Sequence, residues 1–149
     1  MEIQKVKLQM IKDNDTIYTL DTITAPTHIV ELINAHERYD LSPTEKIIVI
    51  AMDNKNKINT YAEIATGVAG YANFNMSNLF KTILLSNGNK FILVHNHPSG
   101  DATPSKEDFD ITEKVKDASK IMGIQFLDHI VIGENNSYTS IMSIREEVK

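Results

Sequence analysis

The 149-residue sequence contains no cysteine. This absence excludes a disulfide framework, a thiolate metal site and a cysteine nucleophile. Any zinc ion in this protein would have to be held by His, Asp or Glu side chains together with water.

The sequence also lacks an excess of basic residues and any long apolar run. Lys and Arg total 15 against 20 Asp and Glu, for a net charge of −5. Proteins that bind nucleic acid through its phosphates normally carry a basic face, so direct nucleic-acid binding is doubtful. No apolar stretch approaches the ~20 residues needed to cross a bilayer, and the N-terminus lacks the continuous apolar core of a signal peptide. We therefore expect a cytoplasmic protein that is not in a membrane.

Hydrophobic residues make up 42% and charged residues 23% of the chain, an ordinary composition for one globular domain with its own core. Alternating apolar residues predict two strands, at 3–10 and 16–23, joined by a turn. These would form an N-terminal hairpin-like extension over residues 1–25. The main domain would then occupy residues 26–149.

Within the main domain, strand and helix patterns alternate along the chain. Strands are predicted at 45–53, 58–67, 90–97 and 123–134, and helices at 26–39, 75–88, 105–122 and 141–148. The polar stretch 135–140 is predicted to be a turn. Such alternation is typical of the α/β class, here a single layered domain whose central mixed sheet is flanked by helices.

The most informative stretch is HNHPSGDATPSKED, residues 95–108. Residues two apart in a strand point to the same face, so His95 and His97 would project to one side and Asn96 to the other. Asp108 falls in the first turn of the next helix, from which its carboxylate can face back toward the strand end. Two imidazole nitrogens and one carboxylate oxygen leave a fourth position for water, which is typical of a catalytic zinc site.

Other interpretations exist for the same residues. Ser105 followed by Glu107 and Asp108 is also typical of a helix N-cap with an acidic first turn. A single histidine at a strand end is more often a structural residue than a ligand. Four residues at fixed offsets in a strand–loop–helix context nevertheless favour the metal site.

The spacing H-x-H-P-x₆-S-x-x-D resembles the signature of JAMM metalloproteases, also called JAB or MPN-plus domains. More closely, HNHPSG at 95–100 and LDHIVIG at 127–133 resemble the RadC-type JAB domain. The resemblance covers roughly residues 27–140 and implies a fold like that of the cytidine deaminases, a central sheet flanked by helices. Deaminase activity itself is excluded, because that site needs cysteine ligands.

The resemblance implies one zinc ion per chain, held by His95, His97 and Asp108. It further implies a glutamate that acts as general base at the start of a buried strand upstream of the histidines. Glu45 fits that description better than Glu63, which is on the next strand and is the alternative.

The resemblance also assigns Ser105 to the developing oxyanion. Asn96 stands where many JAMM peptidases have serine, as it does in RadC-type domains. Asp101 is interpreted as a solvated loop residue. Asp128 and His129 have either a role in the site or that of a buried hydrogen-bonded pair.

These features together predict a zinc metallohydrolase that uses activated water to cleave an amide or isopeptide bond in a peptide or protein. The alternative is a DNA-repair-associated, RadC-like module that acts on or near DNA without strong binding of its own. A third possibility, a scaffold that has lost its metal, conflicts with the intact set of ligands. The oligomeric state and the substrate are left open.

Overall fold

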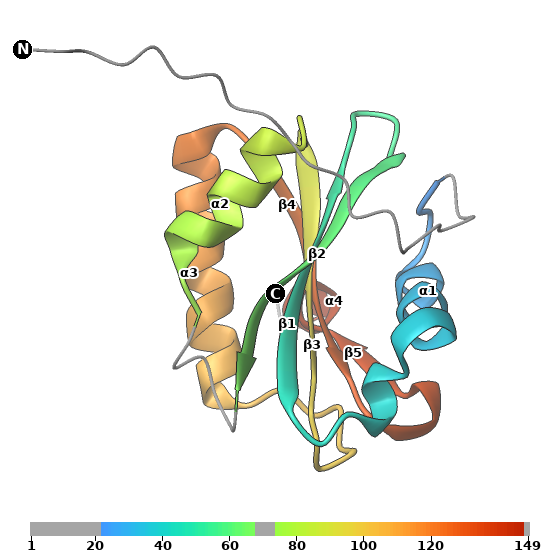
Figure 1. Cartoon of the computed structure of the whole chain (residues 1–149). Helices are drawn as coiled ribbons and strands as arrows, with labels where there is room; N and C mark the ends of the chain where they lie inside the picture. Colours follow the sequence, from blue (N-terminus) through green and yellow to red (C-terminus); the bar gives the residue numbers. More distant parts are fainter. Residues whose placement is uncertain (1–21, 68–73, 148–149) are drawn as a thin grey trace, which may run out of the picture.

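The computed structural model describes residues 22–67 and 74–147 of the chain (Figure 1). The predicted hairpin-like extension over residues 1–25 lies almost entirely outside the described residues and stays a prediction.

The described elements follow one another as predicted, to within a few residues at their ends. They are α1 (Pro26–Glu37), the 3₁₀ turn η1 (Tyr39–Leu41), β1 (Glu45–Met52), β2 (Ile58–Gly67), α2 (Met76–Leu85), β3 (Lys90–Asn96), α3 (Lys106–Met122), β4 (Gln125–Ile132), the 3₁₀ turn η3 (Glu134–Asn136), β5 (Tyr138–Ser140) and α4 (Ile141–Glu147).

One prediction is wrong. The stretch 135–140 is not all turn, because Tyr138–Ser140 forms strand β5 and pairs antiparallel with β4. Three residues are too few to show the period-2 pattern by which a strand is recognised in sequence. Its hydrogen bonds to β4 define the strand instead.

The five strands form one sheet in the order β2-β1-β3-β4-β5. The pair β3–β4 is parallel and the other pairs are antiparallel, so the sheet is mixed. Helices α2 and α3 cover one face of the sheet, and α1 lies over the other (Figure 1). This is the α/β fold predicted from the sequence, a central mixed sheet flanked by helices.

The strand β1 shows how the core is divided. Ile48, Ile50 and Met52 pack into the apolar layer beneath α1. Ile47 and Val49 alternate with them and pack into the layer beneath α2 and α3. We call these the α1 face and the α3 face of the sheet. Strand β1 is buried along nearly its whole length, as expected of a central strand.

The topology brings the ends of three strands together at one edge of the sheet. Strand β1 begins at Glu45, and β3, antiparallel to it, ends at Asn96. Strand β4 runs parallel to β3 and also ends there, at Ile132. The loop after β3 leads directly into the first turn of α3. Polar groups placed at these ends therefore meet between the sheet and the start of α3.

Within residues 22–67 and 74–147, no helix has both the length and the apolar character required to span a membrane.

Candidate metal centre

The three predicted ligands converge at this edge, on the α3 face. The Nε2 atom of His95 lies 3.0 Å from Nε2 of His97 and 3.1 Å from Oδ1 of Asp108. The Nε2 atom of His97 lies 3.3 Å from Oδ2 of Asp108. Each residue offers one ligand atom, and these atoms all lie within 4.8 Å of one another. The cluster can hold a metal ion.

Of the three side chains, only that of His97 is partly exposed. The side chains of His95 and Asp108 are 0% and 2% exposed, whereas that of His97 is 18% exposed. Water can therefore reach the cluster from the His97 side.

The first turn of α3 holds Asp108 in place. Its Oδ2 accepts a hydrogen bond of 2.6 Å from the backbone N–H of Ser105, and its own N–H donates to Oγ of Ser105 over 3.2 Å. This reciprocal pair is a capping box, so the N-cap interpretation of Ser105 is confirmed. Burial raises the pKa of Asp108, but the imidazoles of His95 and His97 outweigh it and hold that pKa well below its ordinary value. The carboxylate is therefore ionised.

A loop carbonyl orients His97. Its Nδ1 lies 2.8 Å from the backbone oxygen of Asp101. A carbonyl oxygen only accepts, so Nδ1 carries the hydrogen and Nε2 faces the cluster. The hydrogen bond to Asp108 raises the pKa of His97 against the effect of its burial, and the charge of Glu45 adds to the increase. The carboxylate of Asp101 is exposed, as predicted, and accepts from the N–H of Thr103.

His95 is supported by a residue on the neighbouring strand. Its Nδ1 lies 2.9 Å from Nε2 of His129, whose Nδ1 lies 2.6 Å from Oγ1 of Thr112. The Thr112 hydroxyl donates to the backbone oxygen of Asp108 over 2.6 Å. Thr112 was not predicted from the sequence. The available signal was its position one helical turn after Asp108.

The side chains of Asp128 and His129 have separate partners. Oδ1 of Asp128 accepts from the backbone N–H of His129 over 2.8 Å and from that of Met142, in the first turn of α4, over 3.2 Å. Asp128 therefore positions α4, whereas the His129 ring faces the metal cluster. The two residues are thus a buried hydrogen-bonded pair, but only through the backbone of His129, because the side chains of strand neighbours point to opposite faces.

The two candidate glutamates lie on opposite faces of the sheet. Glu45 is buried at the start of β1 and shares the α3 face with Ile47, by strand alternation. Extending the register Ile47↔His95 by two residues places Glu45 opposite His97. Glu63 pairs instead with Ile48, on the α1 face.

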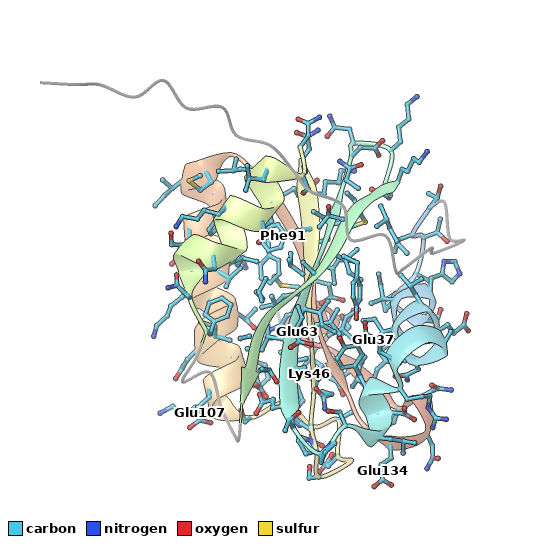
Figure 2. The ribbon with its side chains drawn as sticks, viewed as in Figure 1. Glu37, Lys46, Glu63, Phe91, Glu107 and Glu134 are labelled. Atoms are coloured by element: carbon cyan, nitrogen blue, oxygen red, sulfur yellow. The ribbon has the colours of Figure 1, made fainter. Side chains whose placement is uncertain are left out.

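Glu63 is also bound to a lysine. Its Oε2 lies 2.9 Å from Nζ of Lys46, and Figure 2 labels the two side by side where β1 and β2 adjoin. The structure brings Glu45 to the cluster and keeps Glu63 away from it.

Asn96, between the two histidines, joins β3 to the start of β1. Its Oδ1 accepts from the backbone N–H of Lys46 over 2.9 Å, and its Nδ2 donates to the backbone oxygen of Thr44 over 3.1 Å. These two residues flank Glu45. The β1–β3 ladder ends at the pair Ile47↔His95, and the Asn96 amide continues the connection beyond it.

Two glycines explain why the stretches 95–100 and 127–133 occur together. Gly100 has a φ of +82°, a backbone angle that residues with a side chain rarely adopt. A Cβ there would lie 2.4 Å from Cγ of Glu134. A Cβ on Gly133 would lie 2.4 Å from the backbone oxygen of Gly100. The two loops therefore pack backbone against backbone beside the cluster.

The hydrogen-bond chemistry of the cluster fits a divalent metal ion. When the Nδ1 atoms of His95 and His97 carry hydrogens, their Nε2 lone pairs and the carboxylate of Asp108 meet as three acceptors. A cation among them would interact favourably with all three. A proton on His97 satisfies part of this set, and a metal ion satisfies all three. Ligands of tetrahedral zinc lie roughly 3.3 Å apart, close to the observed 3.0, 3.1 and 3.3 Å.

Each of the three residues also has a partner behind it: His129 behind His95, the Asp101 carbonyl behind His97 and the Ser105 N–H behind Asp108. Such outer contacts are typical of metal ligands, because they fix the tautomer and the orientation of each ligand.

Comparison with known proteins gives a consistent result. The family model of the RadC-like JAB domain matches residues 23–147. The chain is 37% identical over 113 residues to a UPF0758 protein of Desulfitobacterium hafniense, covering 76% of this chain and 49% of the relative. It is 41% identical over 101 residues to a UPF0758 protein of Carboxydothermus hydrogenoformans (68% and 44%), and 40% identical over 113 residues to one of Clostridium botulinum (76% and 48%).

The chain thus spans about half the length of the curated relatives it matches. The match covers every element described above, including the cluster and both glycine loops. The chain belongs to the RadC-like JAB domain family.

Proposed function

We propose that this chain is a zinc-dependent hydrolase of the JAMM type, which uses water to cleave an amide or isopeptide bond in a peptide or protein. The observation that carries the proposal is the convergence of three acceptor atoms, two of them on buried side chains, beside a buried glutamate. Structural zinc sites use four protein ligands, whereas three with an open side are typical of catalysis.

His95, His97 and Asp108 would hold one zinc ion per chain. When bound, zinc acidifies water and polarises a carbonyl group. The open position lies on the side of His97, the most exposed of the three. The ligands are held in place by His129, the Asp101 carbonyl and the Ser105 N–H, so little reorganisation accompanies binding.

Glu45 would carry the proton. Its carboxylate accepts a proton from the attacking water, and the water oxygen forms a bond to the carbonyl carbon. When the carbon–nitrogen bond breaks, the same proton passes to the leaving amine. Support comes from the register that places Glu45 opposite His97 and from the effect of its charge on the His97 pKa.

Ser105 would stabilise the negative charge that develops on the substrate carbonyl oxygen. Its Oγ accepts from the Asp108 N–H, so the hydroxyl hydrogen can be donated away from the helix. One serine would then act both as helix cap and as donor in the site.

The test begins with the chain purified without added metal. Elemental analysis should find about one zinc per chain. The zinc-loaded protein is then incubated with a library of internally quenched peptides and with lysine isopeptide-linked peptides. We expect zinc-dependent cleavage that Glu45→Gln abolishes and Glu63→Gln retains. Zinc-loaded protein that cleaves neither set faster than Glu45→Gln does would overturn the proposal.

A further inference from the structure

His129 forms the middle of a continuous chain of hydrogen bonds that starts and ends at metal ligands. The chain runs from the His95 ring to the His129 ring, to the Thr112 hydroxyl and to the backbone oxygen of Asp108, over distances of 2.9, 2.6 and 2.6 Å. All four residues are buried. These hydrogen bonds connect three consecutive elements, β3, α3 and β4.

The donor and the acceptor of each hydrogen bond in this series follow from its last acceptor, the backbone oxygen of Asp108. The backbone oxygen of Asp108 only accepts, so the Thr112 hydroxyl donates its one hydrogen to it. The Thr112 oxygen must then accept from Nδ1–H of His129. In a neutral imidazole the other nitrogen has a lone pair. Nε2 of His129 therefore accepts, and Nδ1 of His95 donates to it.

The result for His95 is a single tautomer. With its hydrogen on Nδ1, the lone pair of Nε2 points at the cluster, 3.1 Å from Oδ1 of Asp108. The neutral form of His129 that this assignment requires is favoured by its complete burial, because an apolar interior disfavours a charged imidazolium.

We propose that His129 and Thr112 are positioning residues that hold His95 in the tautomer able to bind metal. The proposal deepens the zinc site and rests on the proposed function for its consequence in catalysis. Its structural part, the tautomer of His95, stands whether or not zinc is the metal.

His129 and Thr112 disfavour the opposite tautomer of His95. With hydrogen on Nε2, His95 would donate to the carboxylate of Asp108 and close the cluster without a metal ion. Metal binding would then require a tautomer change and would leave Nδ1–H buried without an acceptor. A buried donor without a partner costs about 1–3 kcal/mol.

Thr112 gives the sharpest substitution, because valine has nearly its shape and no hydroxyl. In Thr112→Val the His129 ring loses the acceptor that keeps its hydrogen on Nδ1. His95 should then populate both tautomers. Thr112→Ser keeps the hydroxyl and is the matched control. The measurement is ¹⁵N NMR of the imidazole nitrogens in metal-free protein, with the His95 signals identified by their loss in His95→Gln.

Wild-type protein and Thr112→Ser should show hydrogen on Nδ1 and none on Nε2 of His95. Thr112→Val should show a mixture. Hydrogen on Nε2 of His95 in metal-free wild-type protein would overturn the proposal, as would an unchanged tautomer in Thr112→Val.

Zinc affinity, measured by competition with a chelator, gives a second readout. His129→Leu removes the acceptor for His95 and should weaken zinc binding about 10- to 100-fold, the usual effect of losing an outer partner of a ligand. His129→Gln offers an amide oxygen in a similar place and should recover part of the loss. His28→Gln, the same substitution far away on α1, should bind zinc as wild type does.

The two proposals fail in different ways. Wild-type protein that binds no zinc but has the Nδ1–H tautomer would reject the zinc hydrolase and keep the role of His129. Wild-type protein that binds zinc with equal affinity in Thr112→Val, Thr112→Ser and His129→Leu would keep the metal site and reject His129 and Thr112 as positioning residues. A folded His129→Leu is not required, because the Thr112 pair tests the same chain of hydrogen bonds.

Discussion

The two faces of the sheet both carry polar groups near the start of β1. The two sets of polar groups differ in the charge and hydrogen-bond partners that they find. On the α1 face, Lys46 binds Glu63 over 2.9 Å, and its ammonium lies 5.1 Å from the centre of the Tyr39 ring. The Tyr61 hydroxyl donates to that of Tyr39 over 2.8 Å, and the Tyr39 hydroxyl donates to Glu63 over 3.5 Å. Here a cation, an anion and two hydroxyl donors satisfy one another.

On the α3 face the same edge has an excess of acceptors. His95, His97 and Asp108 present two nitrogen lone pairs and a carboxylate to one small volume, and Glu45 adds a second carboxylate beside His97. The ion pairs of Arg38, Lys46 and Lys120 are made with Asp40, Glu63 and Asp117.

This difference between the two faces distinguishes a structural polar network from a candidate metal site. Buried polar groups need partners, and the α1 face supplies them from its own residues. Burial raises the pKa of Tyr39 above its ordinary value, so this phenol stays neutral and adds no charge to that network. The α3 face instead gathers acceptors that could hold a metal ion.

The largest expected effect comes from removing a ligand. His97→Ala and Asp108→Ala each take away one of three donors, so zinc should fall from about one per chain to background. Elemental analysis of the purified variants measures this, with circular dichroism to check the fold. Glu63→Gln changes a carboxylate on the other face and should retain zinc. A folded Asp108→Ala with wild-type zinc would remove Asp108 from the ligand set.

The second effect separates the two glutamates. Glu45→Gln keeps size and polarity but cannot accept a proton, so hydrolysis should fall by about 10²–10⁴-fold, the usual contribution of a general base. Its zinc content should be unchanged, because Glu45 is not a ligand in this assignment. Glu63→Gln loses only its ion pair with Lys46, which is partly exposed and contributes at most about 1 kcal/mol. If Glu63→Gln alone lost activity, the role would pass to Glu63.

A smaller effect is expected from Asn96, whose side chain lies on the α1 face although both neighbours serve the α3 face. Asn96→Ala leaves the Lys46 N–H and the Thr44 carbonyl without their partner, so the free energy of unfolding should fall by about 1–3 kcal/mol. Urea denaturation measures this loss.

Because Asn96 holds the backbone on both sides of Glu45, hydrolysis by Asn96→Ala should decrease while zinc content stays the same. Asn59→Ala is the control, since Asn59 also bonds to backbone oxygens, those of Ser86 and Asn87, away from the site. Equal hydrolysis rates in wild type, Asn96→Ala and Asn59→Ala would show that the Asn96 clamp does not position Glu45.

Much of the fold was predictable from periodicity. The alternation in β1, and helical spacing in α2 and α3, are local signals, and these elements were predicted within a few residues. The convergence of His95, His97 and Asp108 was predictable for the same reason, since 14 residues of continuous strand, loop and helix contain all three. The short strand β5 was missed because its identity depends on hydrogen bonds to β4.

The supporting residues could not be predicted by spacing. His129 meets His95 across 34 positions of sequence, through the parallel register of β3 and β4. The choice between Glu45 and Glu63 also depends on register, because a shift between Ile47 and Ile48 in the β1–β2 pairing decides which face Glu63 takes. A one-residue slip reverses the face of every side chain, and the sequence alone does not define it.

Neither face of the sheet is expected to offer a surface to nucleic acid, and we predict weak or absent binding of duplex DNA. Phosphate contacts by Lys and Arg dominate such affinity and determine its salt dependence. On the α1 face Lys46 is already neutralised by Glu63. Near the α3 face, Asp101, Glu107 and Asp110 are exposed, with Glu107 at the start of α3 (Figure 2).

A salt titration of binding to a fluorescent duplex measures this. The dissociation constant at physiological salt should lie no tighter than the non-specific range of ~10⁻⁴–10⁻⁶ M. Glu63→Gln frees Lys46 and removes one negative charge, so any residual affinity should rise slightly in that variant, whereas Asn59→Ala should leave it unchanged. Submicromolar binding by the wild-type chain would mean that local basic side chains outweigh the net charge of −5. The contrast between a balanced α1 face and an acceptor-rich α3 face would then fail to predict DNA binding by this protein.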